Sequence, residues 1–240
     1  MKKNMWDKAS LEYSEAVGDA GDLYHYTYTN PELFKFLGNV KGKNILDLAC
    51  GQGYFSELLE KKGAKVVGVD YSRDMIKIAK GRGLKADFRV RSSSDMKFIK
   101  KETFDCIVCN FGLHDIRDLK GTMEECSRVI KKGGKFVWVI PHPVFYFGKR
   151  NKRDGKYFEE VFGYKGLKIK TVNWFESPIK QYHRPIEYYL NEMFRNGFLI
   201  SGFVEVATRH KDGKVVKEKS LLKFKAEIPS FLVVEGVWSE

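Results

Sequence analysis

The stretch ILDLACGQGYFSELLEKKGAKVVGVD, residues 45–70, predicts a strand, a glycine turn, a helix and a second strand that ends in an acid. The first apolar run leads into Gly51 and Gly53, which lack a Cβ and let a ligand approach the free amides at the helix start. The second run ends at Asp70, where a carboxylate can accept hydrogen bonds from both hydroxyls of a ribose. These features predict a site for an adenosine-bearing cofactor at the carboxyl ends of the strands.

Two further residues of this stretch argue against a dinucleotide as the cofactor. Ser56 stands where a dinucleotide-binding turn carries its third glycine. Asp47, inside the first strand, would repel a pyrophosphate, and we expect it to face a cationic amine of the cofactor instead. The alternative, an ordinary glycine turn without a ligand, leaves Asp47 and Asp70 unexplained.

Apolar runs alternate with amphipathic helical segments along the rest of the chain. The runs that we expect to form parallel strands are 44–50, 65–70, 87–92, 104–111 and 135–141. Two more strands, near 198–208 and 215–225, flank Asp212-Gly213, a dipeptide typical of antiparallel hairpins. We therefore predict an α/β fold with a doubly wound, seven-stranded, mostly parallel sheet, helices on both faces and an antiparallel C-terminal hairpin.

The length of 240 residues predicts one domain with a full hydrophobic core. We expect capping helices in 1–40, the second with Asn30 as N-cap, and a cofactor-binding core in 41–141. Residues 142–185, here called the insertion, lack clear periodicity and are expected to form a basic, aromatic lid that binds the acceptor, before a C-terminal helix and hairpin in 186–240. No run approaches the ~18 apolar residues of a membrane span, and no signal peptide is recognisable, so we expect a cytoplasmic protein.

The four cysteines do not suggest a metal or redox site. Cys106 and Cys109 form a CxxC pair, but they lie in a predicted strand, where residues three apart face opposite sides of the sheet. We expect all four to be small apolar fillers in a reducing compartment, and we expect no metal.

The quoted motifs resemble those of the class I S-adenosylmethionine-dependent methyltransferases, within them the small methyltransferases similar to those of quinone biosynthesis. LDLACGQG resembles the first motif, with Ala49 in place of the usual first glycine, and VVGVDYS resembles the second. The third motif departs from the family, because Ser92-Ser93 aligns with the usual Asp-Ala pair beside the adenine, which leaves Ser92, Ser93, Ser94 or Asp95 to supply that contact. CNFGLHDI resembles the fourth, which implies that Asn110 and Phe111 face the methyl group. The resemblance implies an enzyme that binds S-adenosylmethionine and transfers its methyl group. The expected cofactor contacts are Asp47, Ala49, Gly51, Gly53, Asp70, Tyr71, Ser93, Ser94 and Asn110.

Asn110 and His142 are the candidate catalytic residues. His142 follows the fifth strand and should lie at the same sheet edge as the methyl group, where it would act as a general base; alternatively it bonds to the backbone of the insertion. His114 and Asp115 begin a loop, and we expect them to cap the next helix. His183 and Arg184 precede Pro185 and either bind a carboxylate or phosphate or brace the helix start.

The insertion carries half of the net charge of +12, with ten Lys and Arg against four Asp and Glu. Ten aromatic residues are interleaved with these charges, a combination typical of single-stranded nucleic-acid recognition. We therefore favour a base of structured RNA (rRNA or tRNA) as the methyl acceptor, and keep a small metabolite as the alternative. A non-catalytic adenosine-binding subunit is a third possibility. The expected substrate contacts are Phe111, Phe145, Tyr146, Arg150, Trp174, His183 and Arg184.

Overall fold

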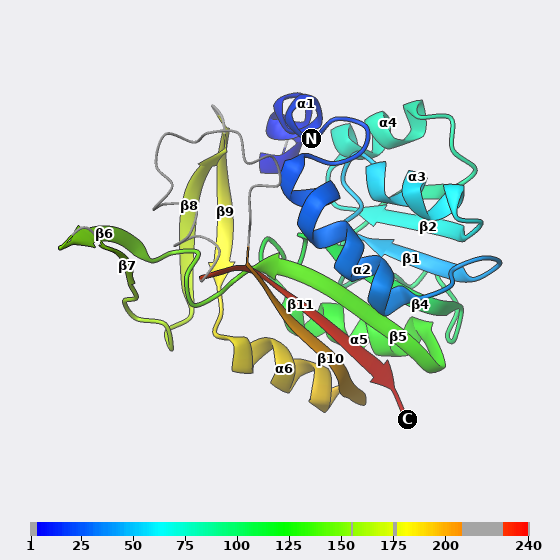
Figure 1. The fold of residues 1–240 in the computed structure, drawn as a ribbon. Helices are drawn as coiled ribbons and strands as arrows, with labels where there is room; N and C mark the ends of the chain where they lie inside the picture. The colour runs from blue at the N-terminus through cyan, green and yellow to red at the C-terminus, as the bar shows by residue number, and fades with distance from the viewer. Residues whose placement is uncertain (1–3, 155, 175–176, 208–227, 240) are drawn as a thin grey trace.

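The computed structural model describes residues 4–154, 156–174, 177–207 and 228–239, with the backbone alone at 150, 152, 156, 157 and 174. Its centre is a seven-stranded sheet in the order β10-β11-β5-β4-β1-β2-β3 (Figure 1). Neighbouring strands from β3 to β5 are parallel, whereas β11 runs antiparallel to both β5 and β10. The predicted doubly wound, mostly parallel α/β fold is confirmed. The strands of this sheet are β1 Asn44–Leu48, β2 Lys65–Asp70, β3 Asp87–Val90, β4 Phe104–Asn110, β5 Ile130–Pro141, β10 Phe198–Ala207 and β11 Pro229–Trp238.

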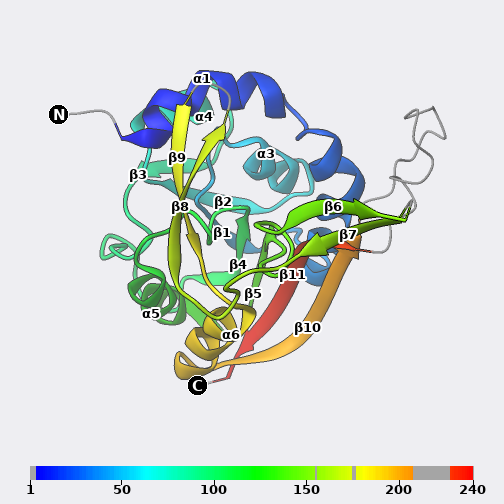
Figure 2. The ribbon, with the colours of Figure 1, turned by 90° about the vertical axis from the view of Figure 1, so that its left-hand side faces the viewer.

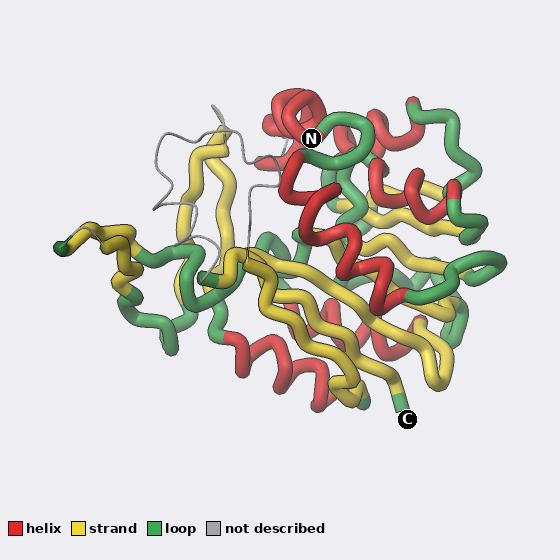
Figure 3. The backbone as a smooth tube through the Cα atoms, in the orientation of Figure 1, coloured by secondary structure: helices red, strands yellow, loops and turns green. Residues whose placement is uncertain are grey.

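Helices cover both faces of the sheet (Figure 3). On one face, α2 and α3 bury Leu33 and Phe55 against the strands, and on the other face α5 and α6 bury Met123 and Met193. Each face has its own apolar core because the strands carry apolar side chains on both sides. None of the helices in the described residues is both long and apolar enough to cross a membrane. The helices are α1 Met5–Val17, α2 Asn30–Leu37, α3 Tyr54–Lys61, α4 Arg73–Gly81, α5 Leu119–Val129 and α6 Ile186–Arg195, with a π-helical turn at His25–Thr29.

The cysteines behave as the strand pattern predicts. Cys106 and Cys109 lie three positions apart on β4, and they pack into the cores on opposite faces of the sheet. All four cysteines are buried and free. The prediction that they serve as apolar fillers is therefore confirmed.

The insertion forms two hairpins, which its sequence does not predict. They are β6 Lys149–Arg153 with β7 Lys156–Glu160, and β8 Lys168–Trp174 with β9 Ser177–His183. Both lie at the carboxyl edge of the parallel strands, and β9 runs beside α1 (Figure 2). The hairpins escape sequence analysis because β6 is almost entirely lysine and arginine and the other strands lack a regular apolar alternation.

Two local predictions need correction, and a third lies outside the described residues. Asn30 is not an N-cap, because the π-helical turn continues directly into α2 and the Asn30 side chain instead accepts a hydrogen bond from the Tyr54 hydroxyl. The fifth strand begins at Ile130, earlier than predicted, immediately after α5. The described antiparallel partner of β10 is β11, whereas the predicted strand 215–225 and the Asp212-Gly213 turn lie outside the described residues.

Candidate active site

A first cavity of about 400 Å³ lies where β1, β2 and β4 end. The turn after β1 forms its floor, α1 and the start of α4 form one wall, and the loop after β4 forms another. Tyr182 of β9 reaches the cavity from the insertion. The predicted contacts Ala49, Gly51, Asp70, Tyr71, Ser93, Asn110 and Phe111 all line it.

The turn between β1 and α3 is built from left-handed backbone. Ala49, Gly51 and Gly53 have φ values of 56°, 53° and 80°. A Cβ added to Gly51 would meet no atom within 4 Å, so the backbone at Gly51 is open to the cavity. A Cβ on Gly53 would instead lie 3.0 Å from Ala79 and 3.1 Å from Phe88. Gly51 therefore leaves room for a ligand, whereas Gly53 allows Ala79 of α4 and Phe88 of β3 to pack closely against the turn.

Asp70 is held in place by the backbone around it. Its carboxylate oxygens accept hydrogen bonds from the amides of Gly51 at 2.9 Å and Ser72 at 2.8 Å. Burial raises the pKa of Asp70 above its ordinary value, and the two amides offset part of that rise. Each oxygen keeps a further lone pair, so the carboxylate can accept hydrogen bonds from the two hydroxyls of a ribose.

Asp47 lies beneath the first cavity and is not among the residues that line it. Its carboxylate accepts a hydrogen bond of 2.6 Å from the hydroxyl of Ser56, the residue that replaces the third glycine. Burial raises the pKa of Asp47 to about 7. The structure thus pairs Asp47 with Ser56, and the predicted contact between Asp47 and a cofactor amine stays a prediction.

Asn110, at the end of β4, belongs to a buried polar group with Tyr54 and Asn30. The Asn110 amide nitrogen donates to the Tyr54 hydroxyl and, at 3.3 Å, to Asn30. The amide oxygen of Asn110 is buried and has no hydrogen-bond partner among the described residues. A buried acceptor without a partner in a cavity wall is a natural contact for a ligand donor.

The serines of the third motif differ in their exposure to the first cavity. Ser93 lines it, and its hydroxyl pairs with that of Thr122 on α5 at 2.8 Å. Ser94 does not line the cavity, and its hydroxyl pairs with that of Ser92 at 2.9 Å. Ser92 lines the cavity together with Ser93, so these two are better placed than Ser94 to contact a bound molecule.

Helix α1 is attached across the first cavity to α4. Asp7, which is 6% exposed, accepts hydrogen bonds from the Ser72 hydroxyl at 2.7 Å and from the amides of Arg73 and Asp74. Asn4 also donates to the Tyr71 carbonyl at 3.2 Å. Sequence analysis missed Asp7, because nothing in the α1 sequence indicates a partner more than sixty residues away.

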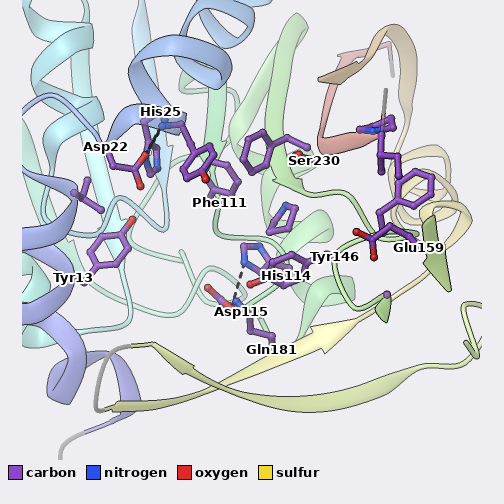
Figure 4. Close-up of a pocket in the computed structure, with 18 of the residues that line it drawn as sticks. Tyr13, Asp22, His25, Phe111, His114, Asp115, Tyr146, Glu159, Gln181 and Ser230 are labelled. Atoms are coloured by element: carbon purple, nitrogen blue, oxygen red, sulfur yellow. Dashed lines mark hydrogen bonds and ion pairs between the residues drawn. The ribbon is translucent and has the colours of Figure 1, made fainter. Parts of the chain in front are cut away.

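A second cavity has a volume of about 500 Å³, and Figure 4 shows residues that line it. Four residues line both cavities: Trp6, Tyr13, Phe111 and Asp115. The rest of its wall includes four further aromatic side chains, Tyr24, Phe145, Tyr146 and Phe231. Its acidic residues are Asp22, Asp115 and Glu159, and no Lys or Arg occurs among the described residues that line it.

His114, Asp115 and Gln181 form a polar group at the junction of the two cavities. Burial lowers the pKa of His114 to about 3 and raises that of Asp115 well above its ordinary value. Within the described residues, Asp115 Oδ1, His114 Nδ1 and both amide atoms of Gln181 lack hydrogen-bond partners. The predicted capping role of His114 and Asp115 is wrong, because α5 is capped by Asp118, whose side chain accepts from the Gly121 amide.

The other candidate histidines lie outside both cavities. His142 is buried against Phe145, and its Nε2 lies 2.8 Å from a carboxylate oxygen of Glu205 on β10. His183 Nε2 lies 2.9 Å from the Tyr164 carbonyl within the insertion. Neither histidine is among the lining residues, so their catalytic and substrate-binding roles stay predictions.

Arg184 is buried and holds the loop after β4. Its guanidinium donates hydrogen bonds to the carbonyls of Leu113, Ile116 and Arg117, at 2.6–3.3 Å. This arrangement favours the bracing alternative for Arg184. Its guanidinium, however, braces the loop that carries His114 and Asp115 and not the predicted helix start. Phe145 and Tyr146, two further predicted substrate contacts, line the second cavity. The side chains of Arg150 and Trp174 lie outside the described part of the structure.

Comparisons with known proteins agree with this geometry. Residues 46–138 match the methyltransferase domain family. The ubiquinone biosynthesis O-methyltransferase of Coxiella burnetii is 34% identical over 143 residues, which cover 55% of this chain and 61% of that relative, less than two thirds of its length. A solved S-adenosylmethionine-dependent methyltransferase from Mesorhizobium loti has a TM-score of 0.75 at 23% identity, covering 86% of this chain and 96% of that one. Another, from Clostridium acetobutylicum, has a TM-score of 0.61 at 20% identity and covers 99% of this chain and 100% of that one.

Residues 46–138 thus match a methyltransferase domain, and the chain has the fold of solved S-adenosylmethionine-dependent methyltransferases. S-adenosylmethionine, the cofactor of those solved proteins, fits the first cavity. Gly51 leaves its backbone open, the Asp70 carboxylate is oriented for a ribose, and the Asn110 amide oxygen lacks a partner in the described structure.

Proposed function

We propose that this protein is a methyltransferase that moves the methyl group of S-adenosylmethionine to a hydroxyl oxygen of a small, largely apolar molecule with an aromatic body. The observation that carries this proposal is the second cavity, which shares four wall residues with the first. A molecule in the second cavity would lie next to one in the first. Such proximity can supply about 7–11 kcal/mol of the reaction barrier.

The walls of the second cavity support a small apolar acceptor. Its volume of about 500 Å³ lies within the range of about 300–1,000 Å³ typical of small-molecule sites. Rings of Phe111 and Phe231 pack edge-to-face at 5.2 Å, and Tyr24 contacts Phe231 at 5.9 Å, which gives a continuous aromatic surface. The matched relative from Coxiella burnetii is named as an O-methyltransferase of ubiquinone biosynthesis, which supports a hydroxyl of a small molecule as the acceptor.

The RNA alternative depends on the charge of the insertion and receives less support. The acidic side chains Asp22 and Glu159 line the second cavity, where they would repel the phosphates beside a flipped base. Two lysines of the insertion make internal contacts: Lys170 Nζ lies 3.9 Å from the centre of the Phe147 ring, and Lys165 pairs with Glu187 at 2.7 Å. These contacts explain part of the basic charge without a nucleic acid.

Methyl transfer from labelled S-adenosylmethionine to a panel of phenols and catechols, and separately to unmethylated RNA, tests the proposal. We expect label in a small product, identified by mass spectrometry, and none in RNA. Label in a nucleoside, together with RNA affinity that falls with salt and with Lys149→Gln and Arg153→Gln, would instead establish the RNA reading. Binding of S-adenosylhomocysteine without label in any acceptor would point to a non-catalytic subunit.

A further inference from the structure

Asp22 and His25 form a side-chain pair in the wall of the second cavity, just after α1 (Figure 4). His25 Nδ1 lies 2.7 Å from Asp22 Oδ1. The same oxygen accepts hydrogen bonds from the backbone amides of Tyr24 and His25 at 2.8 and 3.0 Å. Because a carboxylate can only accept, Nδ1 carries the proton in this contact, and in the neutral ring Nε2 has the free lone pair.

The surroundings of His25 fix its ring and leave Nε2 available. The ring is 6% exposed and packs edge-to-face between Tyr54 and Phe111, with centroids 5.2 and 5.1 Å away. A Cβ on Gly21 would lie 2.5 Å from the His25 Cβ, so glycine at that position lets the chain pass close to the histidine. Nε2 is buried and has no hydrogen-bond partner among the described residues.

The position of His25 connects the two cavities. Phe111, which packs on its ring, lines both of them. The hydroxyl of Tyr54, which also packs on the His25 ring, donates to Asn30 and accepts from the amide of Asn110. Asn110 lines the first cavity. His25 therefore lies in the second cavity, beside residues of the wall that this cavity shares with the first.

The other titratable groups of the second cavity are less suited to take up a proton. His114 has a pKa of about 3 because of its burial, and its nearest acidic oxygen, on Asp115, is 3.7 Å away. Burial raises the pKa of Asp115 well above its ordinary value, and its Oδ1 has no hydrogen-bond partner among the described residues to orient it. Burial also raises the pKa of Tyr13, and the carboxylates of Asp22, Asp115 and Asp70 raise it further. Glu159 lines the cavity from β7, in the insertion.

We propose that His25 is the general base of the reaction and that Asp22 is the residue that positions it. This inference rests on the proposed function. The acceptor oxygen forms its bond to the methyl carbon, the carbon–sulfur bond breaks with its electron pair left on sulfur, and the hydroxyl proton passes to Nε2. Asp22 stabilises the imidazolium, which then releases the proton to solvent.

The test compares the wild type with His25→Ala, Asp22→Asn and a control, Asp19→Asn, an exposed carboxylate of the same loop. S-adenosylhomocysteine should bind equally to all four proteins, which establishes that each one is folded. With a hydroxyl acceptor found by the panel above, kcat should fall about 100- to 1,000-fold in His25→Ala, while KM changes less than about threefold. Added imidazole should restore part of the activity of His25→Ala, and Asp19→Asn should equal the wild type.

Turnover by His25→Ala within about threefold of the wild type, or a loss confined to KM, would overturn the assignment. A second measurement does not need an acceptor: ¹⁵N shifts of the His25 ring should show the Nδ1–H tautomer in the wild type and a mixture in Asp22→Asn. The Nε2–H tautomer in the wild type would overturn the inference by itself. Absence of any methylated product with the expected tautomer would count against the proposed function while supporting the arrangement of this pair.

Discussion

The two cavities of this protein are built in different ways. The first depends on backbone: a left-handed turn at Ala49–Gly53, two amides that hold Asp70, and strand ends that meet at one edge of the sheet. The second depends on side chains from α1, the loop after it, the β4–α5 loop, the insertion and the start of β11. A cavity built from backbone fixes one type of ligand, whereas a cavity built from side chains can change its ligand by substitution without loss of the fold.

The strongest test of this comparison is Asp70→Asn. Loss of a hydrogen-bonding charge costs about 1.5–3 kcal/mol, so affinity for S-adenosylhomocysteine should fall roughly 10- to 150-fold in calorimetry. Asp105→Asn is the matched control, since that carboxylate also accepts from a backbone amide, of Asn44, but lies at the opposite end of the strands. It should keep cofactor affinity. Equal losses in the two variants would mean that Asp70 acts only through the fold.

Arg184→Met tests the second cavity, as Asp70→Asn tests the first. The variant leaves three backbone carbonyls of the β4–α5 loop without their charged donor, which should lower the free energy of unfolding by about 2–3 kcal/mol in urea. Acceptor KM should rise more than cofactor Kd, because His114 and Asp115 lie on this loop. A rise in cofactor Kd alone would contradict this division.

Gly51→Ala tests whether the backbone of the first cavity must be bare. Left-handed backbone costs a residue with a Cβ about 1–2 kcal/mol. Gly42→Ala is the control, because Gly42 also has a positive φ, 78° against 53° for Gly51, and equally open surroundings but lies outside both cavities. Both variants should lose similar stability in thermal unfolding, whereas cofactor affinity should fall, by roughly tenfold, in Gly51→Ala alone. Unchanged affinity would show that no ligand approaches Gly51.

Asp7→Asn should have the smallest effect, about 1 kcal/mol of unfolding free energy at pH 7. Burial raises the pKa of Asp7, but hydrogen bonds from Ser72, Asn4, Asp74 and Arg73 together bring it below its ordinary value of 3.8. Because the folded-state pKa is depressed, this stabilisation is complete above the unfolded value and is lost as pH falls below about 3.8 through the folded-state pKa. The difference between variant and wild type should shrink over that range in urea titrations. Asp87→Asn, on exposed β3, should cost less than about 0.5 kcal/mol.

Sequence analysis predicted the first cavity well because its signals are local. Gly51, Asp70 and the ends of β1 and β2 all lie within 45–70, and the apolar runs on either side of the turn mark those two strands. Asp47 shows the limit of this reasoning: the motif marks the residue, yet its Ser56 partner depends on side-chain directions that spacing does not give.

The second cavity could not be predicted in the same way. Its residues come from segments as far apart as Trp6, Gln181 and Phe231, and only the folded chain brings them together. Charge counting pointed to the insertion as a nucleic-acid surface, but a count cannot show that Lys170 lies over Phe147 or that Lys165 pairs with Glu187. The Asp22–His25 spacing was available in the sequence as a helix-start pattern, without any sign that a cavity lies beside it.

The attachment of α1 to α4 has a kinetic consequence. Asp7 and Asn4 close the wall of the first cavity by bonding to Ser72 and Tyr71, so exchange of a spent cofactor through that wall requires those bonds to break first. Since α1 also lines the second cavity, the same opening loosens the acceptor. Under the proposed function, departure of the two products would then be coupled through one helix–helix contact.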